Sequence, residues 1–431
     1  MKTITKRLAL LLFFALAFQS IEAQTPEGRN YTAVFTGFDW GPSLNKVILK
    51  SDAPLTTVAK EDFTVYVNRT SSEGEIAARF ASGTRSIVHA FVSDAAGNPV
   101  AEGEHITLIL SVAPNDPLGS PIQYFRSATR GGNIWIDFQL TVLNTKTQAL
   151  WNQEADRIVP VVDAFDLNGS YTHTDGIKLT YASFMPETNS SKIPLIIWLH
   201  GGGEGGTDPS IAILANKAYN YAAPAIQRHF GAAAVLAPQT PTRWMHGVSG
   251  NSTRGQEDDI YHKAIMGLVD QYVKVHPNID KNRIYVGGCS NGGYMSLKLL
   301  IENPSYFAAG YISSLAYFDE FVSDKDLLKL KNIPIWLVHS QDDKTTVADK
   351  TATPLYHRLI KSGARNVHYS LFDHVIDITG QYGGSSYHYN GHWAWVYLHD
   401  NQVFLDFDGS PVTVKGKAVS IMEWMAAQKK K

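Results

Sequence analysis

The sequence has very little cysteine, since Cys289 is the single one among 431 residues, and no disulfide can form within the chain. Beyond the first residues it lacks any apolar run long enough to span a membrane. It also lacks an excess of charge, with 38 Lys+Arg against 40 Asp+Glu. This balance gives no strong attraction to nucleic acid or to an anionic membrane. These absences indicate a globular protein that is stabilised by burial of its core. Its length is enough for two or three domains.

The first 23 residues have the pattern of a secretory signal peptide. Lys2, Lys6 and Arg7 precede an apolar run from Leu8 to Phe18, and a small residue, Ala23, offers a cleavage site. Without this segment, three cations and Glu22 are removed from the totals above, which leaves 35 Lys+Arg, 39 Asp+Glu and a net charge near −4. We therefore expect a protein exported to the periplasm or the medium.

Residues 24–145 predict a first domain made of β-strands. Short β-branched or aromatic runs alternate with turn clusters, and their number and spacing favour an immunoglobulin-like β-sandwich. The runs are Tyr31–Phe35, Lys46–Leu49, Phe63–Val67, Ser86–Val92, His105–Val112 and Trp135–Val142. Carbohydrate binding, homo-oligomerisation and roofing of a catalytic cleft stay open as roles for this domain. The loop Asp39–Pro42 is either a ligand contact or an aromatic plug, and residues 146–158 predict a connector.

Residues 159–431 predict a second domain in which apolar strands alternate with helical patterns. This alternation indicates a mostly parallel sheet with helices on both faces. The expected strands are Leu179–Pro186, Pro194–Leu199, Ala233–Pro238, Arg283–Val286, Phe307–Ile312, Ile333–Val338 and Val367–Phe372, with helices over Ile260–Val275 and Ile421–Ala427.

The segment Gly288-Cys289-Ser290-Asn291-Gly292 fits G-x-S-x-G between a predicted strand and a predicted helix. This context is typical of a nucleophile elbow, where a sharp turn exposes the serine hydroxyl. Small residues are needed two positions to either side because strand and helix approach closely there. Ser290 is therefore the candidate nucleophile. Cys289 is the rival nucleophile. The corresponding motif centred on Cys289 would need glycine two residues later, and that position is Asn291. A plain glycine-rich turn is the alternative without chemistry.

The segment His200-Gly201-Gly202-Gly203 follows a buried strand upstream of the elbow. In the α/β-hydrolase layout a loop at this place gives one oxyanion donor, and the residue after the nucleophile gives the other. The backbone N–H of Gly202 or Gly203, with that of Asn291, is our candidate oxyanion hole. A phosphate-binding loop is the alternative, although the segment lacks the Lys-Ser/Thr of a P-loop.

Candidates for the acid and the base lie downstream of Ser290, in the order Ser, Asp, His that is typical of hydrolases. Asp343 follows a buried strand and is preferred as the acid because it lies four residues after His339; its neighbour Asp342 is the alternative. His392 is the candidate general base. His374 and His388 are its rivals, and His388 with His392 forms H-x3-H, a weak metal pattern without a convincing third ligand.

Trp244 lies on a loop over the expected cleft, so it is a candidate for substrate binding, with ordinary packing as the alternative. The proposed chemistry requires no cofactor and no metal.

The chain resembles secreted bacterial α/β-hydrolases of the EstA type, in which an immunoglobulin-like domain precedes a prolyl-oligopeptidase-like or polyhydroxybutyrate-depolymerase-like catalytic domain. The resemblance rests on His200–Glu204, Ala237–Gln239, Asp280–Tyr285, Gly288–Tyr294 and Tyr389–Trp393, and in the first domain on Asp39–Pro42 and Glu61–Phe63. Ser340 departs from it, because the family usually has glycine after the histidine.

The resemblance implies hydrolysis of carboxylic esters, with short acyl or aryl esters as substrates and feruloyl or acetyl esters of carbohydrates as natural targets. Two alternatives remain: a serine peptidase acting on short peptides, and a carbohydrate-binding protein with an inactive hydrolase fold. Neither nucleic acid nor a membrane span is expected as a partner.

Overall fold

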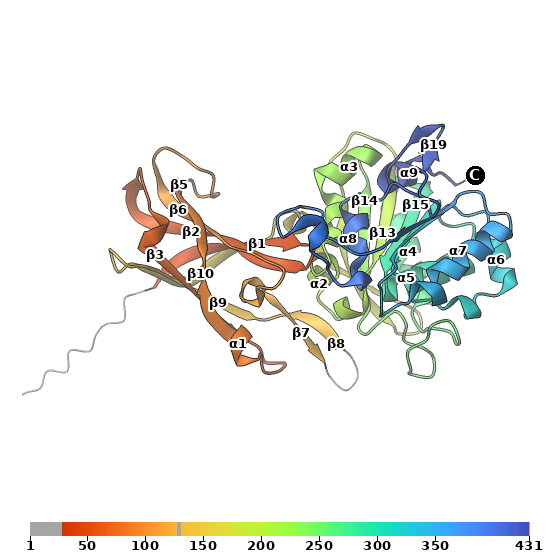
Figure 1. Ribbon diagram of the computed structural model, residues 1–431, viewed down its shortest axis with the longest axis horizontal. Coiled ribbons are helices and arrows are strands. Elements are labelled where there is room, and N and C mark those ends of the chain that lie inside the picture. Colours follow the sequence, from red (N-terminus) through yellow and green to blue (C-terminus); the bar gives the residue numbers. More distant parts are fainter. Residues whose placement is uncertain (1–27, 127–130, 431) are drawn as a thin grey trace, which may run out of the picture.

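The structure is a computed structural model, and it describes residues 28–126 and 131–430. The expected signal peptide, residues 1–23, lies outside the described residues. Two large sheets lie side by side along the long axis of the molecule, one from each half of the chain (Figure 1). Among the described residues, no helix combines the length and apolar character needed to cross a membrane.

The first sheet has eight strands in the order β4-β3-β9-β10-β1-β2-β6-β5. All neighbours pair antiparallel except β1 and β10, which are parallel. Its two halves enclose one buried cluster that includes Val65, Leu140, Val47 and Leu108. The strands are β1 (Arg29–Phe38), β2 (Gly41–Leu55), β3 (Phe63–Thr70), β4 (Ser82–Arg85), β5 (Ile87–Ser93), β6 (Gly103–Leu110), β9 (Asp137–Asn144) and β10 (Leu150–Ile158). A short helix, α1 (Ala78–Ala81), precedes β4.

Two expectations for this half of the chain are wrong. The connector expected over 146–158 contains β10, because Leu150–Ile158 pairs with both β1 and β9. Asn152 to Asp156 are all exposed, so the strand has no apolar alternation to reveal it. The run Trp135–Val142 is not one strand, because β8 (Gly131–Trp135) ends at Trp135 and β9 begins at Asp137. β8 pairs with β7 (Ile122–Arg126) in a separate hairpin.

The second sheet has the order β11-β12-β14-β13-β15-β16-β17-β18. It is parallel from β14 to β18, while β11 and β12 are antiparallel additions at one edge. The mostly parallel sheet confirms the expected fold class. The strands are β11 (Asp166–Thr172), β12 (Lys178–Phe184), β13 (Ile193–Leu199), β14 (Ala234–Gln239), β15 (Ile279–Cys289), β16 (Ala309–Ser313), β17 (Ile335–Ser340) and β18 (Val367–Phe372). Near the C-terminus, β19 (Thr413–Val414) and β20 (Lys417–Ala418) form a small hairpin.

Helices cover both faces of this sheet (Figure 1). Side chains of β13 alternate between two cores: Leu195 and Ile197 pack in one, Ile196 and Trp198 in the other. The core that contains Leu195 and Ile197 also includes residues of α4 (His262–Val275), α5 (Asn291–Glu302), α6 (Asp324–Leu330) and α7 (Ala352–Lys361). The core that contains Ile196 and Trp198 includes residues of α2 (Pro209–Leu214), α3 (Pro224–Phe230), α8 (Trp395–His399) and α9 (Ile421–Ala427). This core is continuous with the core of the first sheet.

Candidate active site

Ser290 lies at the turn between β15 and α5, where its backbone has φ 53° and ψ −110°. This left-handed conformation is unusual for a residue with a side chain and holds the hydroxyl at the end of the sheet. A Cβ on Gly292 would lie 1.8 Å from the carbonyl oxygen of Leu199, and one on Gly288 would lie 2.4 Å from the same atom. Both glycines are therefore required by the close approach of β13, as the motif predicts.

The side chains of Ser290, His392 and Asp343 meet although they come from distant parts of the chain. His392 Nε2 lies 2.8 Å from Ser290 Oγ, and His392 Nδ1 lies 2.8 Å from Asp343 Oδ2. Because a carboxylate only accepts hydrogen bonds, Nδ1 carries the proton and Nε2 is free to accept the serine proton. The arrangement has the geometry of a nucleophile, a base and an orienting acid.

Asp343 is fully enclosed by donors. Its Oδ2 accepts hydrogen bonds from the Thr346 hydroxyl at 2.8 Å and from His339 Nε2 at 3.2 Å, and the backbone N–H groups of Thr345 and Thr346 bind Oδ1. Burial would raise the pKa of Asp343, but the hydrogen bonds from His339 and His392 outweigh it and lower the pKa. The group is thus held as a carboxylate.

The rival residues point elsewhere. Asp342 accepts hydrogen bonds from Ser340 Oγ at 2.5 Å and from His374 Nδ1 at 2.9 Å, so the departure from the family pattern at Ser340 supports this loop rather than altering Asp343. His388 stacks on His374 with ring centroids 4.2 Å apart. Cys289 is buried, its Sγ accepts from Asn216, and burial raises the pKa of its thiol.

The candidate oxyanion residues converge beside Ser290. Gly202, Gly203 and Asn291 all line the cavity that contains Ser290. A Cβ on Gly202 would lie 3.8 Å from Asn291 Nδ2, so the glycine loop and the start of α5 are adjacent. The Asn291 side chain is itself held, because its Oδ1 accepts the backbone N–H of Met245 at 3.3 Å.

The expectation that Trp244 contacts substrate is wrong. The indole is fully buried, and its Nε1 donates to the carbonyl oxygen of His200 at 3.1 Å. Its neighbours Arg243 and Met245 line the cavity instead. Trp244 therefore packs behind the glycine loop, which is the packing alternative that the sequence left open.

The cavity around Ser290 has a volume of about 790 Å³ and is lined by both halves of the chain. The tip of the β1–β2 hairpin contributes Trp40, whose ring meets Tyr382 edge-on at 4.9 Å. The β7–β8 hairpin contributes Tyr124 and Asn133, and both hairpins extend from the first domain toward the second (Figure 1). Sequence reasoning missed the β7–β8 contribution, because contacts between domains leave no local pattern.

Glu204, at the end of the glycine loop, is a further residue to which the sequence assigned no role. Its carboxylate accepts a hydrogen bond from Asn133 Nδ2 of β8 at 3.3 Å. Burial raises the pKa of Glu204 to about 7, against the opposing effect of the Asn133 hydrogen bond. The first domain therefore contacts the glycine loop directly.

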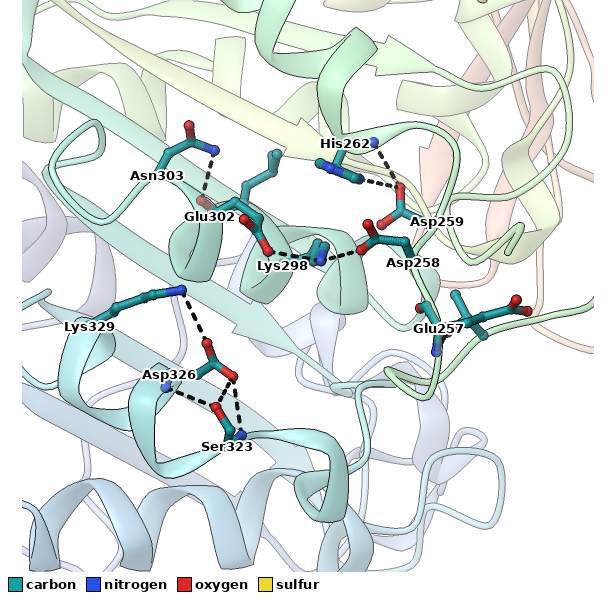
Figure 2. A network of polar contacts seen from close by, with 12 residues as sticks. Glu257, Asp258, Asp259, His262, Lys298, Glu302, Asn303, Ser323, Asp326 and Lys329 are labelled. Carbon is teal, nitrogen blue, oxygen red and sulfur yellow. Dashed lines mark hydrogen bonds and ion pairs between the residues drawn. The ribbon is translucent and has the colours of Figure 1, made fainter. Parts of the chain in front are cut away.

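Helix α5 is fixed on its other side by the polar network of Figure 2. Lys298 Nζ donates to Asp258 Oδ1 at 2.6 Å and to Glu302 Oε1 at 2.9 Å. The neighbouring Asp259 accepts the backbone N–H of His262, the first residue of α4. These contacts join α5, the helix that follows Ser290, to the start of α4.

Within residues 28–126 and 131–430, no three His, Cys, Asp or Glu side chains are grouped so that they could hold a metal ion. Of the two histidines in the H-x3-H pattern, His392 faces Ser290 and Asp343, whereas His388 stacks on His374.

Comparisons with known proteins agree with this architecture. Residues 30–155 match the family of the esterase Ig-like N-terminal domain, and residues 183–377 match the phospholipase/carboxylesterase family. The crystal structure of a thermostable esterase superposes with a TM-score of 0.71 at 21% identity, covering 93% of this chain and 99% of that chain. No curated protein matches the sequence.

A hydrolase, the S-formylglutathione hydrolase from Agrobacterium tumefaciens, is also similar, with 13% identity, a TM-score of 0.37, and coverage of 55% of this chain and 94% of that one. The two family matches, with the shared fold, confirm the resemblance to esterases in which an Ig-like domain precedes the catalytic domain. The chain is a serine hydrolase in which an esterase Ig-like domain precedes a phospholipase/carboxylesterase domain of the α/β-hydrolase fold.

Proposed function

We propose that the protein is a carboxylesterase in which Ser290 is the nucleophile, His392 the general base and Asp343 the orienting acid. The observation that carries the proposal is the unbroken line of 2.8 Å contacts from Ser290 Oγ through both ring nitrogens of His392 to Asp343 Oδ2. His392 takes the hydroxyl proton as Ser290 Oγ bonds to the ester carbonyl carbon. The same proton then goes to the departing alcohol, leaving an acyl-enzyme that water hydrolyses by the reverse path.

The backbone N–H groups of Gly202 or Gly203 and of Asn291 are the proposed oxyanion hole. They line the cavity with Ser290, and Asn291 opens α5, whose N-terminal end favours negative charge. Each donor aimed at the developing oxyanion is worth about 3 kcal/mol of transition-state stabilisation.

The proposed substrates are short acyl or aryl esters, including feruloyl and acetyl esters of carbohydrates. The cavity of about 790 Å³ has room for an aromatic acyl group beside a sugar, and Trp40, Tyr124 and Trp395 offer aromatic surfaces. The proposed site of action is the periplasm or the medium, on the basis of the signal-like pattern in residues 1–23.

A substrate panel tests the proposal. The mature protein would be assayed with 4-nitrophenyl esters of graded acyl length, feruloyl and acetyl sugars, and 4-nitroanilides of the same acyl groups. We expect ester hydrolysis to exceed anilide hydrolysis, and Ser290→Ala to lose about 10⁶-fold in kcat. Anilide turnover above ester turnover would favour the peptidase alternative. A wild-type protein inert toward every ester would contradict the proposal.

A further inference from the structure

Three arginines line the cavity that contains Ser290, and the esterase chemistry above uses none of them. Arg69 is fully buried and donates to the backbone carbonyl oxygens of Phe80, Ser120 and Ile122, which leaves two others. Arg243 and Arg254 are both on the segment between β14 and α4, and both side chains are half-buried. Across the described residues, neither guanidinium forms an ion pair with Asp or Glu. Both guanidinium groups can therefore pair with an anion that enters the cavity.

The backbone holds both arginines in place. The Arg254 guanidinium lies over the Phe318 ring at 4.7 Å, and the Phe318 N–H donates to the carbonyl oxygen of Arg254 at 2.9 Å. Arg243 lies between Thr242 and Trp244, and the Trp244 indole is bonded to His200 at the start of the glycine loop. The segment that carries Arg243 is thus linked to the start of the glycine loop, and Arg254 is held against Phe318.

Other charged groups on the cavity do not neutralise these arginines. Asp39 is engaged by Lys217, whose Nζ lies 2.8 Å from Asp39 Oδ1. Burial raises the pKa of Glu204 to about 7, so at neutral pH it carries less than a full negative charge. The uncompensated charge that faces a bound substrate is therefore positive.

We propose that Arg243 and Arg254 bind a carboxylate on the ester substrate. Guanidinium groups pair with carboxylates through two parallel hydrogen bonds, and the interaction is strengthened where water is partly excluded. The inference rests on the proposed esterase function and narrows its substrates to esters whose acyl or alcohol part carries an acid group. The two arginines act on binding, and the reaction at Ser290 is unchanged.

Two pairs of matched esters test this inference and show which side of the ester carries the acid. For the acyl side, 4-nitrophenyl 4-carboxybenzoate is compared with its uncharged 4-carbamoyl twin. For the alcohol side, 4-acetoxybenzoate is compared with 4-acetoxybenzamide. We expect kcat/KM to favour the acid by about tenfold in at least one pair, because one charged hydrogen-bonded contact is worth that much.

The variants Arg243→Gln and Arg254→Gln should each reduce kcat/KM for the acid about tenfold, mostly through KM, and leave the uncharged twin within about twofold. Arg243→Lys should keep part of the preference, because it keeps the charge but loses the planar fork. Arg228→Gln, on an exposed residue outside the cavity, is the matched control and should change neither member. The preference should also weaken as ionic strength rises.

Equal rates for acid and uncharged twins in both pairs would overturn the inference, as would a preference that survives in both glutamine variants. Failure of the proposed function looks different, since then neither member of any pair would be hydrolysed. Melting curves of each variant separate loss of the fold from loss of binding.

Discussion

At the scale of single residues, two adjacent aspartates have opposite surroundings. Asp343 is buried among five donors that include His392, whereas Asp342 is a third exposed and bonded to Ser340 and His374. Their positions in the sequence give little reason to prefer one as the orienting acid. In the structure, the turn after β17 directs Asp343 inward and Asp342 toward solvent. The two therefore form a natural matched pair for testing the orienting acid.

The variant Asp343→Asn should lower kcat about 10⁴-fold, because the amide can present an N–H to His392 and favour the wrong tautomer. Asp342→Asn should change kcat by no more than about twofold, since it lies outside the line from Ser290. Steady-state kinetics on a 4-nitrophenyl ester measures both. A larger loss in Asp342→Asn than in Asp343→Asn would reverse the assignment.

At the scale of elements, the β7–β8 hairpin brings the first domain to the reacting centre. A Cβ on Gly203 would lie 3.3 Å from Asn133 Nδ2 and 3.5 Å from Tyr124 Cε2, so the hairpin lies against the glycine loop. Trp135 Nε1 donates to Ser210 Oγ of α2 at 2.8 Å and fixes the base of the hairpin. Of the roles left open for the first domain, a wall of the cavity is the one that these contacts support.

Tyr124→Ala should raise KM for aromatic acyl esters about fivefold and leave acetate esters nearly unchanged, because one aromatic contact is worth about 1 kcal/mol. Tyr66→Ala is the control, since Tyr66 is 43% exposed against 46% for Tyr124 and lies outside the cavity lining. The measurement is KM and kcat for both ester classes. An equal effect of the two substitutions would show that the hairpin does not contact the acyl group.

At the scale of the whole molecule, a partly buried cation joins the two domains. Lys217 Nζ lies 2.8 Å from Asp39 Oδ1 in the first domain and 2.9 Å from Asp400 Oδ2 in the second. Burial raises the pKa of Asp400 to about 6 although Lys217 opposes the shift. The folded protein therefore holds a proton on Asp400 more tightly than the unfolded chain does. The contribution of Asp400 to the free energy of unfolding is fully present below its ordinary pKa and is lost as the pH rises through about 6.

Lys217→Met leaves the buried carboxylate of Asp39 and the partly buried carboxylate of Asp400 without a cation. It should lower the free energy of unfolding by about 3 kcal/mol at pH 8. The loss should be smaller at pH 5, where Asp400 can take up a proton. Thermal melts at both pH values measure this, with Lys274→Met on the exposed side of α4 as control. A pH-independent loss, or none, would contradict a role for the cluster in holding the domains together.

The sequence predicts most of the second domain, because burial leaves a readable pattern there. The seven residues of β13 are all buried, and the glycines at 288 and 292 are required by one carbonyl oxygen. The order of Ser290, Asp343 and His392 in the chain also indicated which side chains would meet, and the structure brings these three together.

What the sequence missed depends on contacts between distant segments. β10 is a polar strand recognisable only from its partners β1 and β9. Trp244 is buried because His200 and Tyr261 surround it, which no local pattern announces. The wall formed by Tyr124 and Asn133 likewise exists only once the two domains meet.

The most direct test of the account is to locate the covalent adduct of a fluorophosphonate, which reacts with an activated serine. The inactivated protein would be digested and its peptides analysed by mass spectrometry. We expect one adduct, on Ser290, and no labelling of Ser290→Ala although that variant remains folded. An adduct at another residue that abolishes activity, or a Ser290→Ala protein that still hydrolyses esters at the wild-type rate, would contradict the account.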